Sequence, residues 1–152
     1  MIDVQTAPFR MGNVFEKLSA PYLGEGDKFG AVSKERTKEY SVPLVYAKYG
    51  DNGIMYWAKK GDFTTYENVI SVVYNGVIAA GRVYPQKQAT GILAESYFIR
   101  PNVQFKIPFE TTIYLAKVIE KTIYPKYSRE YLAIHGRLRE ASRFIFITSW
   151  VL

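Results

Sequence analysis

The chain has 152 residues, enough for one domain with a sizeable core, and its 48% hydrophobic and 22% charged residues exclude a disordered or low-complexity protein. It has no cysteine, which excludes disulfides, thiolate nucleophiles and cysteine-based zinc sites. The net charge is +6, and the excess of cations lies in residues 28–60 and 121–152, a balance that favours binding to a polyanion.

The sequence gives no sign of targeting to a membrane. Residues 1–6 carry neither the basic segment nor the apolar stretch that begins a signal peptide, and no run of about 18 to 20 apolar residues follows. We therefore expect a cytoplasmic protein that binds no membrane.

The N-terminal part of the chain predicts little regular structure. Residues 8–13 indicate a short strand that turns into one or two helical turns over residues 14–18, with Asn13 as the helix N-cap. Residues 19–41 lack periodicity and contain Pro21 and three glycines, which predicts a long loop. Loops of this length are uncommon unless they have a function.

The middle of the chain predicts a sheet. Strands are expected at residues 42–47, 54–57, 69–74, 77–84 and 92–99. The run from Val69 to Tyr74 is nearly continuous in β-branched residues, which predicts a central strand. Turns are expected at Asn52-Gly53, at residues 59–62 and at Asn75-Gly76, with a loop at residues 85–91.

One long helix follows the strands. Apolar residues recur at helical spacing over residues 109–124, and Pro108 and Pro125 bracket this range. The fold class predicted is α+β: a mixed, mainly antiparallel twisted sheet with hairpin loops and one long C-terminal helix. We expect residues 8–127 to form the domain and residues 128–152 to form a helical or irregular tail.

The tail carries an apolar pattern. From Tyr131 to Ile145 apolar residues alternate at spacings of three and four, although Gly136 interrupts them. This pattern allows two readings, pairing with a second copy to form a homodimer or packing on the domain.

No catalytic motif stands out. His135 is the single histidine, no Gly-x-Ser-x-Gly elbow accompanies it, and neither a metal-ligand cluster nor a phosphate-binding glycine loop occurs. We expect no metal and no cofactor. A magnesium-dependent nuclease is the enzyme alternative, and its candidate residues are Asp62, Glu67 and Glu95 with Lys59 or Lys60.

The turn segments combine cations, amides and aromatic rings. Lysine and arginine can hold phosphates or guanine edges, asparagine and glutamine can pair with adenine, and tyrosine can stack. Taken singly, each segment is more typical of an ordinary solvated hairpin loop than of a DNA contact. Together they predict DNA contacts at Lys48, Tyr49, Asn52, Lys59, Lys60, Tyr74, Asn75, Arg82, Gln86, Lys87 and Gln88.

The order of several segments resembles the target recognition domains of type I restriction-modification specificity subunits and of related type II domains. The segments are Phe9-Arg-Met-Gly-Asn-Val-Phe-Glu-Lys, Val42-Pro-Leu-Val, Gly50-Asp-Asn-Gly-Ile, Glu67-Asn-Val-Ile-Ser-Val-Val-Tyr-Asn-Gly and Gly91-Ile-Leu-Ala-Glu-Ser-Tyr-Phe-Ile-Arg. The resemblance covers roughly residues 8–124.

This resemblance implies a non-enzymatic subunit that reads one half of a split sequence in double-stranded DNA and directs methyltransferase (modification) and restriction subunits. The chain departs from the family by holding one recognition domain, and its tail lacks the Leu-Pro lead into a spacer helix. Two alternatives stay open: a restriction endonuclease subunit that cleaves DNA itself, and a non-enzymatic binding module for another polyanion or protein.

Overall fold

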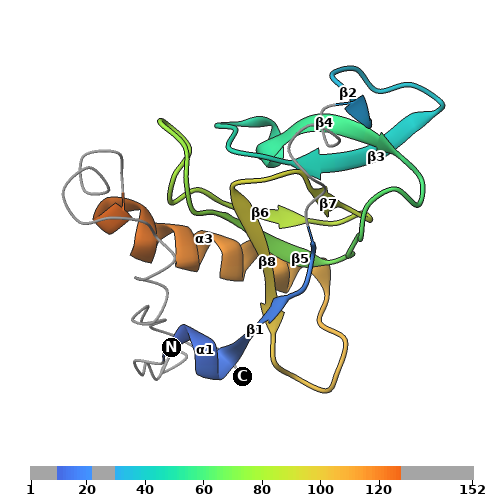
Figure 1. The fold of residues 1–152 in the computed structure, drawn as a ribbon. Coiled ribbons are helices and arrows are strands. Elements are labelled where there is room, and N and C mark those ends of the chain that lie inside the picture. The colour runs from blue at the N-terminus through green and yellow to red at the C-terminus, as the bar shows by residue number, and fades with distance from the viewer. Residues whose placement is uncertain (1–9, 22–29, 128–152) are drawn as a thin grey trace.

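Two four-stranded sheets and one long helix form the chain in the computed structural model, which describes residues 10–21 and 30–127 (Figure 1). The first sheet has the order β1-β8-β5-β6, and every neighbouring pair is antiparallel. Its strands are β1 (Phe15–Leu18), β5 (Val69–Val73), β6 (Val83–Gln86) and β8 (Ser96–Pro101).

The second sheet has the order β2-β4-β3-β7. Its strands are β2 (Val32–Ser33), β3 (Tyr40–Val45), β4 (Ile54–Lys59) and β7 (Gly91–Ile92). The pairs β2–β4 and β3–β4 are antiparallel, whereas β3–β7 is parallel. The predicted α+β class with mixed, mainly antiparallel pairing is therefore confirmed, although the strands form two sheets and not one.

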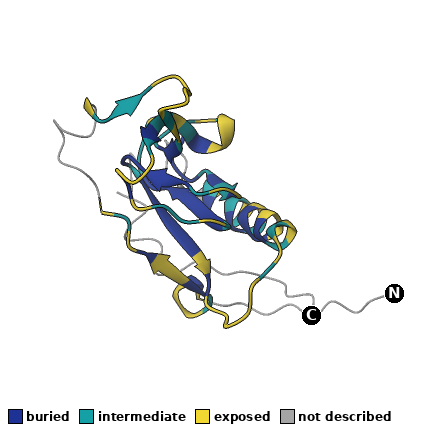
Figure 2. Cartoon of the chain, turned by 90° about the vertical axis from the view of Figure 1, so that its right-hand side faces the viewer, coloured by how far each residue is buried: buried dark blue, intermediate teal, exposed yellow. Residues whose placement is uncertain are grey.

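The first sheet lies between the helix and the second sheet. Helix α3 (Phe109–Tyr127) buries Leu115, Ala116, Ile119 and Ile123 in a cluster with Ile70, Val72 and Ile99 of the first sheet. The neighbouring residues Val69 and Phe98 pack instead with Val45 and Ile92 of the second sheet. Because alternate residues of a strand face opposite sides, β5 is buried on both faces. Figure 2 shows buried strands beside the helix. The prediction that residues 69–74 contain a central strand is confirmed.

The N-terminal elements occur in the opposite order to the one predicted. Helix α1 (Met11–Val14) comes first and strand β1 follows it, with Arg10 and not Asn13 at the N-cap position and no side-chain cap. Phe15 and Leu18 are buried, and β1 pairs with β8. Tertiary pairing therefore outweighs the local helical pattern over residues 14–18.

Residues 77–99 also differ from the prediction. Residues 77–81 form a turn in which Gly81 N donates to Val73 O (2.9 Å), so the next strand begins at Val83 and includes Pro85. Proline is tolerated there because β6 is an edge strand. The predicted strand 92–99 divides into β7 and β8, and Glu95 between them has a left-handed φ of 58°.

Other boundaries also shift, and the predicted strand 42–47 is observed as β3 at Tyr40–Val45. The predicted long loop 19–41 contains β2, β4 extends through Lys59, and α3 continues past Pro125 to Tyr127. The predicted turn at Asn52-Gly53 is confirmed as a single 3-10 turn, η1 (Asp51–Gly53), in which Asn52 has a φ of 55°. The predicted tail, with its apolar seam, lies outside the described residues.

Candidate nucleic-acid interface

The predicted DNA-contacting residues fall into separate regions of the structure. Arg82 contacts the side chains of Tyr49, Tyr124 and Glu120. Its guanidinium carbon lies 4.5 Å from the ring centre of Tyr49 and 3.9 Å from that of Tyr124, and its Nη1 lies 3.6 Å from Glu120 Oε1. The other carboxylate oxygen of Glu120 accepts the backbone N–H of Val83 at 2.9 Å. Arg82 therefore joins the loop after β3 to helix α3.

Gln86 is buried, so the expectation that it sits in a presented loop is wrong. Its Nε2 donates to Asn52 O at 2.8 Å and to Ser71 Oγ at 3.0 Å. In turn, Asn52 Nδ2 donates to Pro85 O at 2.6 Å and to Gln86 Oε1 at 3.1 Å. The two amides connect η1 to β6, because the strand extends two residues further than predicted, to Gln86.

Tyr84 of β6 also holds the loop that contains η1. Its hydroxyl accepts the backbone N–H of Gly50 at 3.0 Å and donates to Lys48 O at 3.3 Å. Burial raises the pKa of Tyr84, so the hydroxyl stays protonated over the neutral range. Lys48 itself pairs with Asp51 at 2.5 Å. The loop after β3 is therefore held in place by the Tyr84 hydroxyl and by its own ion pair.

Tyr74 is also buried, contrary to its predicted presentation, and its ring stacks on that of Tyr97 with 6.1 Å between ring centres. Asn75 follows it in a bend that is half-buried. The adjacent Gly76 lies against Ala47, because a Cβ built on it would come within 2.7 Å of the alanine Cβ. The turn after β5 thus packs on the loop after β3.

Lys59 and Lys60 lie at the end of β4 in the second sheet. Lys59 Nζ is 2.6 Å from Glu39 Oε1, and this hydrogen-bonded glutamate raises the pKa of the lysine. Lys60 is exposed at the turn. The structure does not bring these two lysines to the other predicted residues.

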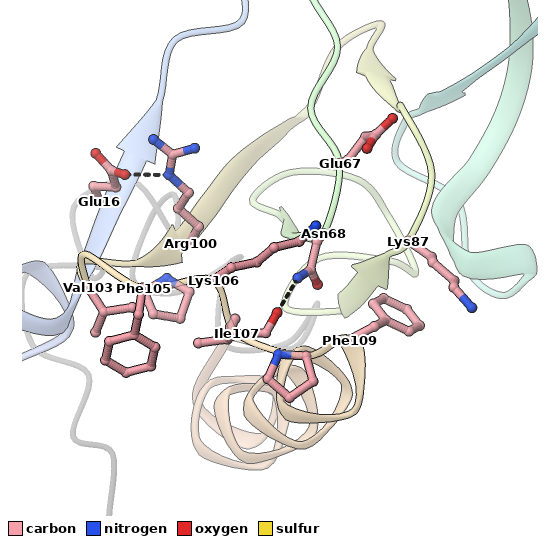
Figure 3. Close-up of a pocket in the computed structure, with 12 residues that line it drawn as sticks. Glu16, Glu67, Asn68, Lys87, Arg100, Val103, Phe105, Lys106, Ile107 and Phe109 are labelled. Carbon is pink, nitrogen blue, oxygen red and sulfur yellow. Dashed lines mark hydrogen bonds and ion pairs between the residues drawn. The ribbon is translucent and has the colours of Figure 1, made fainter.

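Lys87 and Gln88 are exposed beside a groove of about 540 Å³, shown in Figure 3. Arg100, Val103 and Phe105 lie on one side of this groove, and Lys87 and Phe109 lie on the other. A second hollow of about 480 Å³ shares Lys87 and Phe109, and continues the surface past residues that include Asn52, Gln88 and Ile113. We call this continuous surface the groove.

The loop between β8 and α3, residues 102–108, supplies groove residues that the sequence reasoning missed. Phe105 is 70% exposed, and Gln104 and Lys106 beside it are also exposed. The run Asn102-Val-Gln-Phe-Lys106 holds two amides, an aromatic ring and a cation, the same combination that singled out the hairpin turns. That combination is the signal that could have identified it.

Asn68 fixes the base of the groove. Its Nδ2 donates to Ile107 O at 2.8 Å, and its Oδ1 accepts the hydroxyl of Thr112 in the first turn of α3 at 2.6 Å. At the opposite end of the loop the backbone N–H of Asn102 donates to Val14 O at 2.8 Å. The loop is therefore held at both ends while residues 103–106 are exposed.

The groove carries charges of both signs. Arg100 pairs with Glu16 on the neighbouring strand. Lys87 lies 5.7 Å from the ring centre of Phe109, and Lys106 and Glu67 complete the ionisable residues of the lining. With Arg100 and Glu16 paired, two lysines face one glutamate, which leaves a modest positive balance suited to phosphate oxygens.

The carboxylates considered for a nuclease are not gathered. Across residues 10–21 and 30–127, no group of three or more histidine, aspartate or glutamate side chains could hold a metal ion. Asp62 lies in the exposed turn after β4, Glu67 lines the groove, and Glu95 lies between β7 and β8. His135 lies outside the described residues. In the described part of the chain, no helix is long and apolar enough to cross a membrane.

The fold matches a solved structure. A type I restriction-modification system S subunit from M. genitalium superposes with a TM-score of 0.65 over 95% of this chain, at 17% sequence identity. This chain spans 34% of that subunit, about a third of its length. No family model matches the sequence, and no curated protein matches it. The resemblance to a target recognition domain is thus confirmed at the level of the fold.

Proposed function

We propose that this chain is a DNA-reading specificity component of a restriction-modification system, acting in the cytoplasm without catalytic chemistry of its own. One observation carries the proposal: 95% of the chain shares its fold with a type I S subunit. The groove supports it independently, because its exposed side chains are the cations, amides and aromatic rings that DNA recognition uses.

The groove residues divide by chemistry. Lys87 and Lys106 hold phosphates, since an ammonium group binds a phosphate oxygen whatever the base sequence. Gln88 reads a base edge from the groove, and Gln104, exposed next to the lining residues Val103 and Phe105, reads another, because a carboxamide can give and accept one hydrogen bond with adenine. Phe105 contributes apolar contact to the bases or sugars beside them.

The chain reads one half of a split site and directs partner subunits that carry methyl transfer and cleavage. Its span of about a third of the M. genitalium subunit fits one reading unit within a larger specificity subunit. The other half-site is then read by a second copy or by another recognition domain, and we propose methyltransferase and restriction subunits as the partners.

Binding to duplex DNA tests the phosphate role. We expect Lys87→Ala and Lys106→Ala each to weaken all duplexes alike and to lower the slope of log affinity against log salt by about one unit. Lys121→Ala removes an exposed charge from α3 outside the groove lining and is the matched control. An equal effect of all three substitutions would contradict the placement.

Incubation with DNA, magnesium and S-adenosylmethionine tests the absence of catalysis. We expect neither methyl transfer nor cleavage by the chain alone, and gain of both when the partner subunits are added. Cleavage by the lone chain would favour the nuclease alternative. Equal binding to DNA and to other polyanions, with no preferred duplex sequence, would favour the general binding module.

A further inference from the structure

The connection from β2 to β3 forms a basic loop that neither the groove nor the predicted turns include. Residues 34–39 are all exposed, and their sequence is Lys-Glu-Arg-Thr-Lys-Glu. β4 lies between β2 and β3 in the sheet, so this loop spans β4. Figure 1 places the second sheet at the top of the molecule and the β8–α3 loop of the groove at the bottom.

The loop is held by hydrogen bonds at both ends. The backbone N–H of Glu35 donates to Ser33 Oγ at 3.1 Å. Thr37 and Tyr40 form two bonds: Thr37 N donates to Tyr40 O, and Tyr40 N donates to Thr37 Oγ1, each at 3.0 Å. These bonds order the two ends of the loop before it binds a partner.

Arg36 is stacked on Trp57. The guanidinium carbon lies 5.2 Å from the indole ring centre. Tyr56 and Ala58, the neighbours of Trp57 in β4, pack in the core cluster, so alternation along the strand places Trp57 on the outer face. A guanidinium held over an aromatic ring retains N–H groups that can bind two phosphate oxygens.

The charged residues around Arg36 also favour an anionic ligand. Segments 34–39 and 59–62 together hold five cations and three acidic groups. Lys59 is paired with Glu39, whereas Lys34, Arg36, Lys38 and Lys60 form no ion pair with any residue that the structure describes. Three cations in this loop and a fourth, Lys60, in the turn after β4 thus form no ion pair with the described residues, a charge balance suited to a phosphodiester backbone.

We propose that the Arg36–Trp57 stack, with Lys34, Lys38 and Lys60, is a second DNA contact that grips the phosphate backbone and reads no sequence. This inference rests on the proposed DNA-binding function. We call the contact formed by Arg36, Trp57, Lys34, Lys38 and Lys60 the clamp. Duplex DNA is the occupant, because phosphates along a duplex repeat at a spacing that several cations of one loop can meet. The groove then supplies sequence preference and the clamp supplies affinity and register.

The salt dependence of binding tests the clamp. Affinity for the preferred duplex and for an unrelated duplex is measured between about 50 and 200 mM salt for Arg36→Ala and for the control Lys121→Ala. We expect Arg36→Ala to lower the slope of log affinity against log salt by about one unit on both duplexes, equivalent to a three- to fourfold difference over that range. The ratio of the two affinities stays unchanged. An unchanged slope, or an equal change in the control, overturns the proposal.

The stack has its own test. Arg36→Lys keeps the charge but loses the planar edge, so we expect the slope to be kept and the affinity to fall by several fold. In a Trp150→Phe background Trp57 is the one tryptophan left, and we expect its fluorescence to change when duplex DNA binds. Unchanged Trp57 fluorescence at saturating DNA contradicts the clamp.

The two proposals can fail separately. If Arg36→Ala lowers the slope but no duplex sequence is preferred, the clamp stands and sequence reading fails. If a sequence is preferred but Arg36→Ala and Arg36→Lys bind like the unchanged chain, sequence reading stands and the clamp fails. If Arg36→Ala loses only binding to a methyltransferase subunit, the loop contacts protein and the clamp fails.

Discussion

Arg82 shows how one residue can satisfy a recognition pattern and serve the fold. Its guanidinium is stacked between Tyr49 and Tyr124 and paired with Glu120, and only 21% of its side chain is exposed. A residue enclosed on three sides has little surface left for a base edge. Its prediction as a DNA contact followed from residue type and turn position, neither of which reports burial.

We therefore expect Arg82→Lys to affect stability more than DNA binding. Lysine keeps the charge but loses the planar stack on two rings, so the free energy of unfolding should fall by about 1 to 2 kcal/mol. Urea unfolding measures it, and Arg100→Lys, at an exposed pair, should change it by less than about 1 kcal/mol. Unchanged stability combined with weaker DNA binding would show that Arg82 faces the DNA.

Tyr97 gives a prediction on alkaline stability. Burial raises the pKa of its hydroxyl above the ordinary 10.0, and burial also raises that of Tyr84. A raised pKa in the folded state means that stability is complete below about pH 10 and is lost as the pH rises through the folded value. We expect the free energy of unfolding to decrease above pH 10, and Tyr97→Phe to reduce that decrease by about 1.4 kcal/mol per pH unit.

The same substitution probes the unpartnered hydroxyl. Tyr97 Oη has no hydrogen-bond partner among the residues that the structure describes. Removing it at pH 7 should therefore leave stability unchanged or raise it by about 1 kcal/mol, as measured by urea unfolding. A loss of more than about 1 kcal/mol would contradict this account of the site.

At the scale of elements, Asn68 connects β5, the groove loop and α3. It has a left-handed φ of 51°, and its amide bonds Ile107 and Thr112. Asn68→Gly keeps the backbone conformation and removes the amide, so we expect a loss of about 1 to 3 kcal/mol in the free energy of unfolding. Asn68→Ala adds backbone strain and should lose more. Equal losses in both variants would show that the backbone conformation matters little here.

The sequence predicts an element well where local pattern and burial agree. Val69–Val73 is β-branched and buried on both faces, so the prediction of a central strand holds. Phe15–Leu18 has a helical pattern, but its pairing with β8 depends on residues at least 80 positions away. Local patterns do not contain such partners.

The candidate site was predictable only in part for the same reason. Lys87 and Gln88 are exposed on the groove as loop residues should be, whereas Gln86 is buried because β6 includes it. The β8–α3 loop joins the groove because Asn68 binds Ile107 across 39 positions of sequence. Residue types indicated the chemistry, and long-range contacts decided which residues share a surface.

At the scale of the molecule, two surfaces of different chemistry lie on the two sheets. The groove borders the first sheet and α3 and offers amides beside Lys87 and Lys106, whereas the proposed clamp lies on the second sheet and offers cations that form no ion pair with the described residues. Loss of a phosphate contact weakens every duplex alike, while loss of a base contact relaxes the choice at one base pair. The two kinds of substitution should therefore be distinguishable in one experiment.

Selection of bound oligonucleotides from a random duplex pool is the most direct test of sequence reading. We expect enrichment of one short motif, the half-site, and we expect Gln88→Ala or Gln104→Ala to relax it at a single base pair by about 1 to 3 kcal/mol. Arg36→Ala should leave the motif unchanged. Absence of any enriched motif, or a motif that survives both glutamine substitutions intact, would contradict the account.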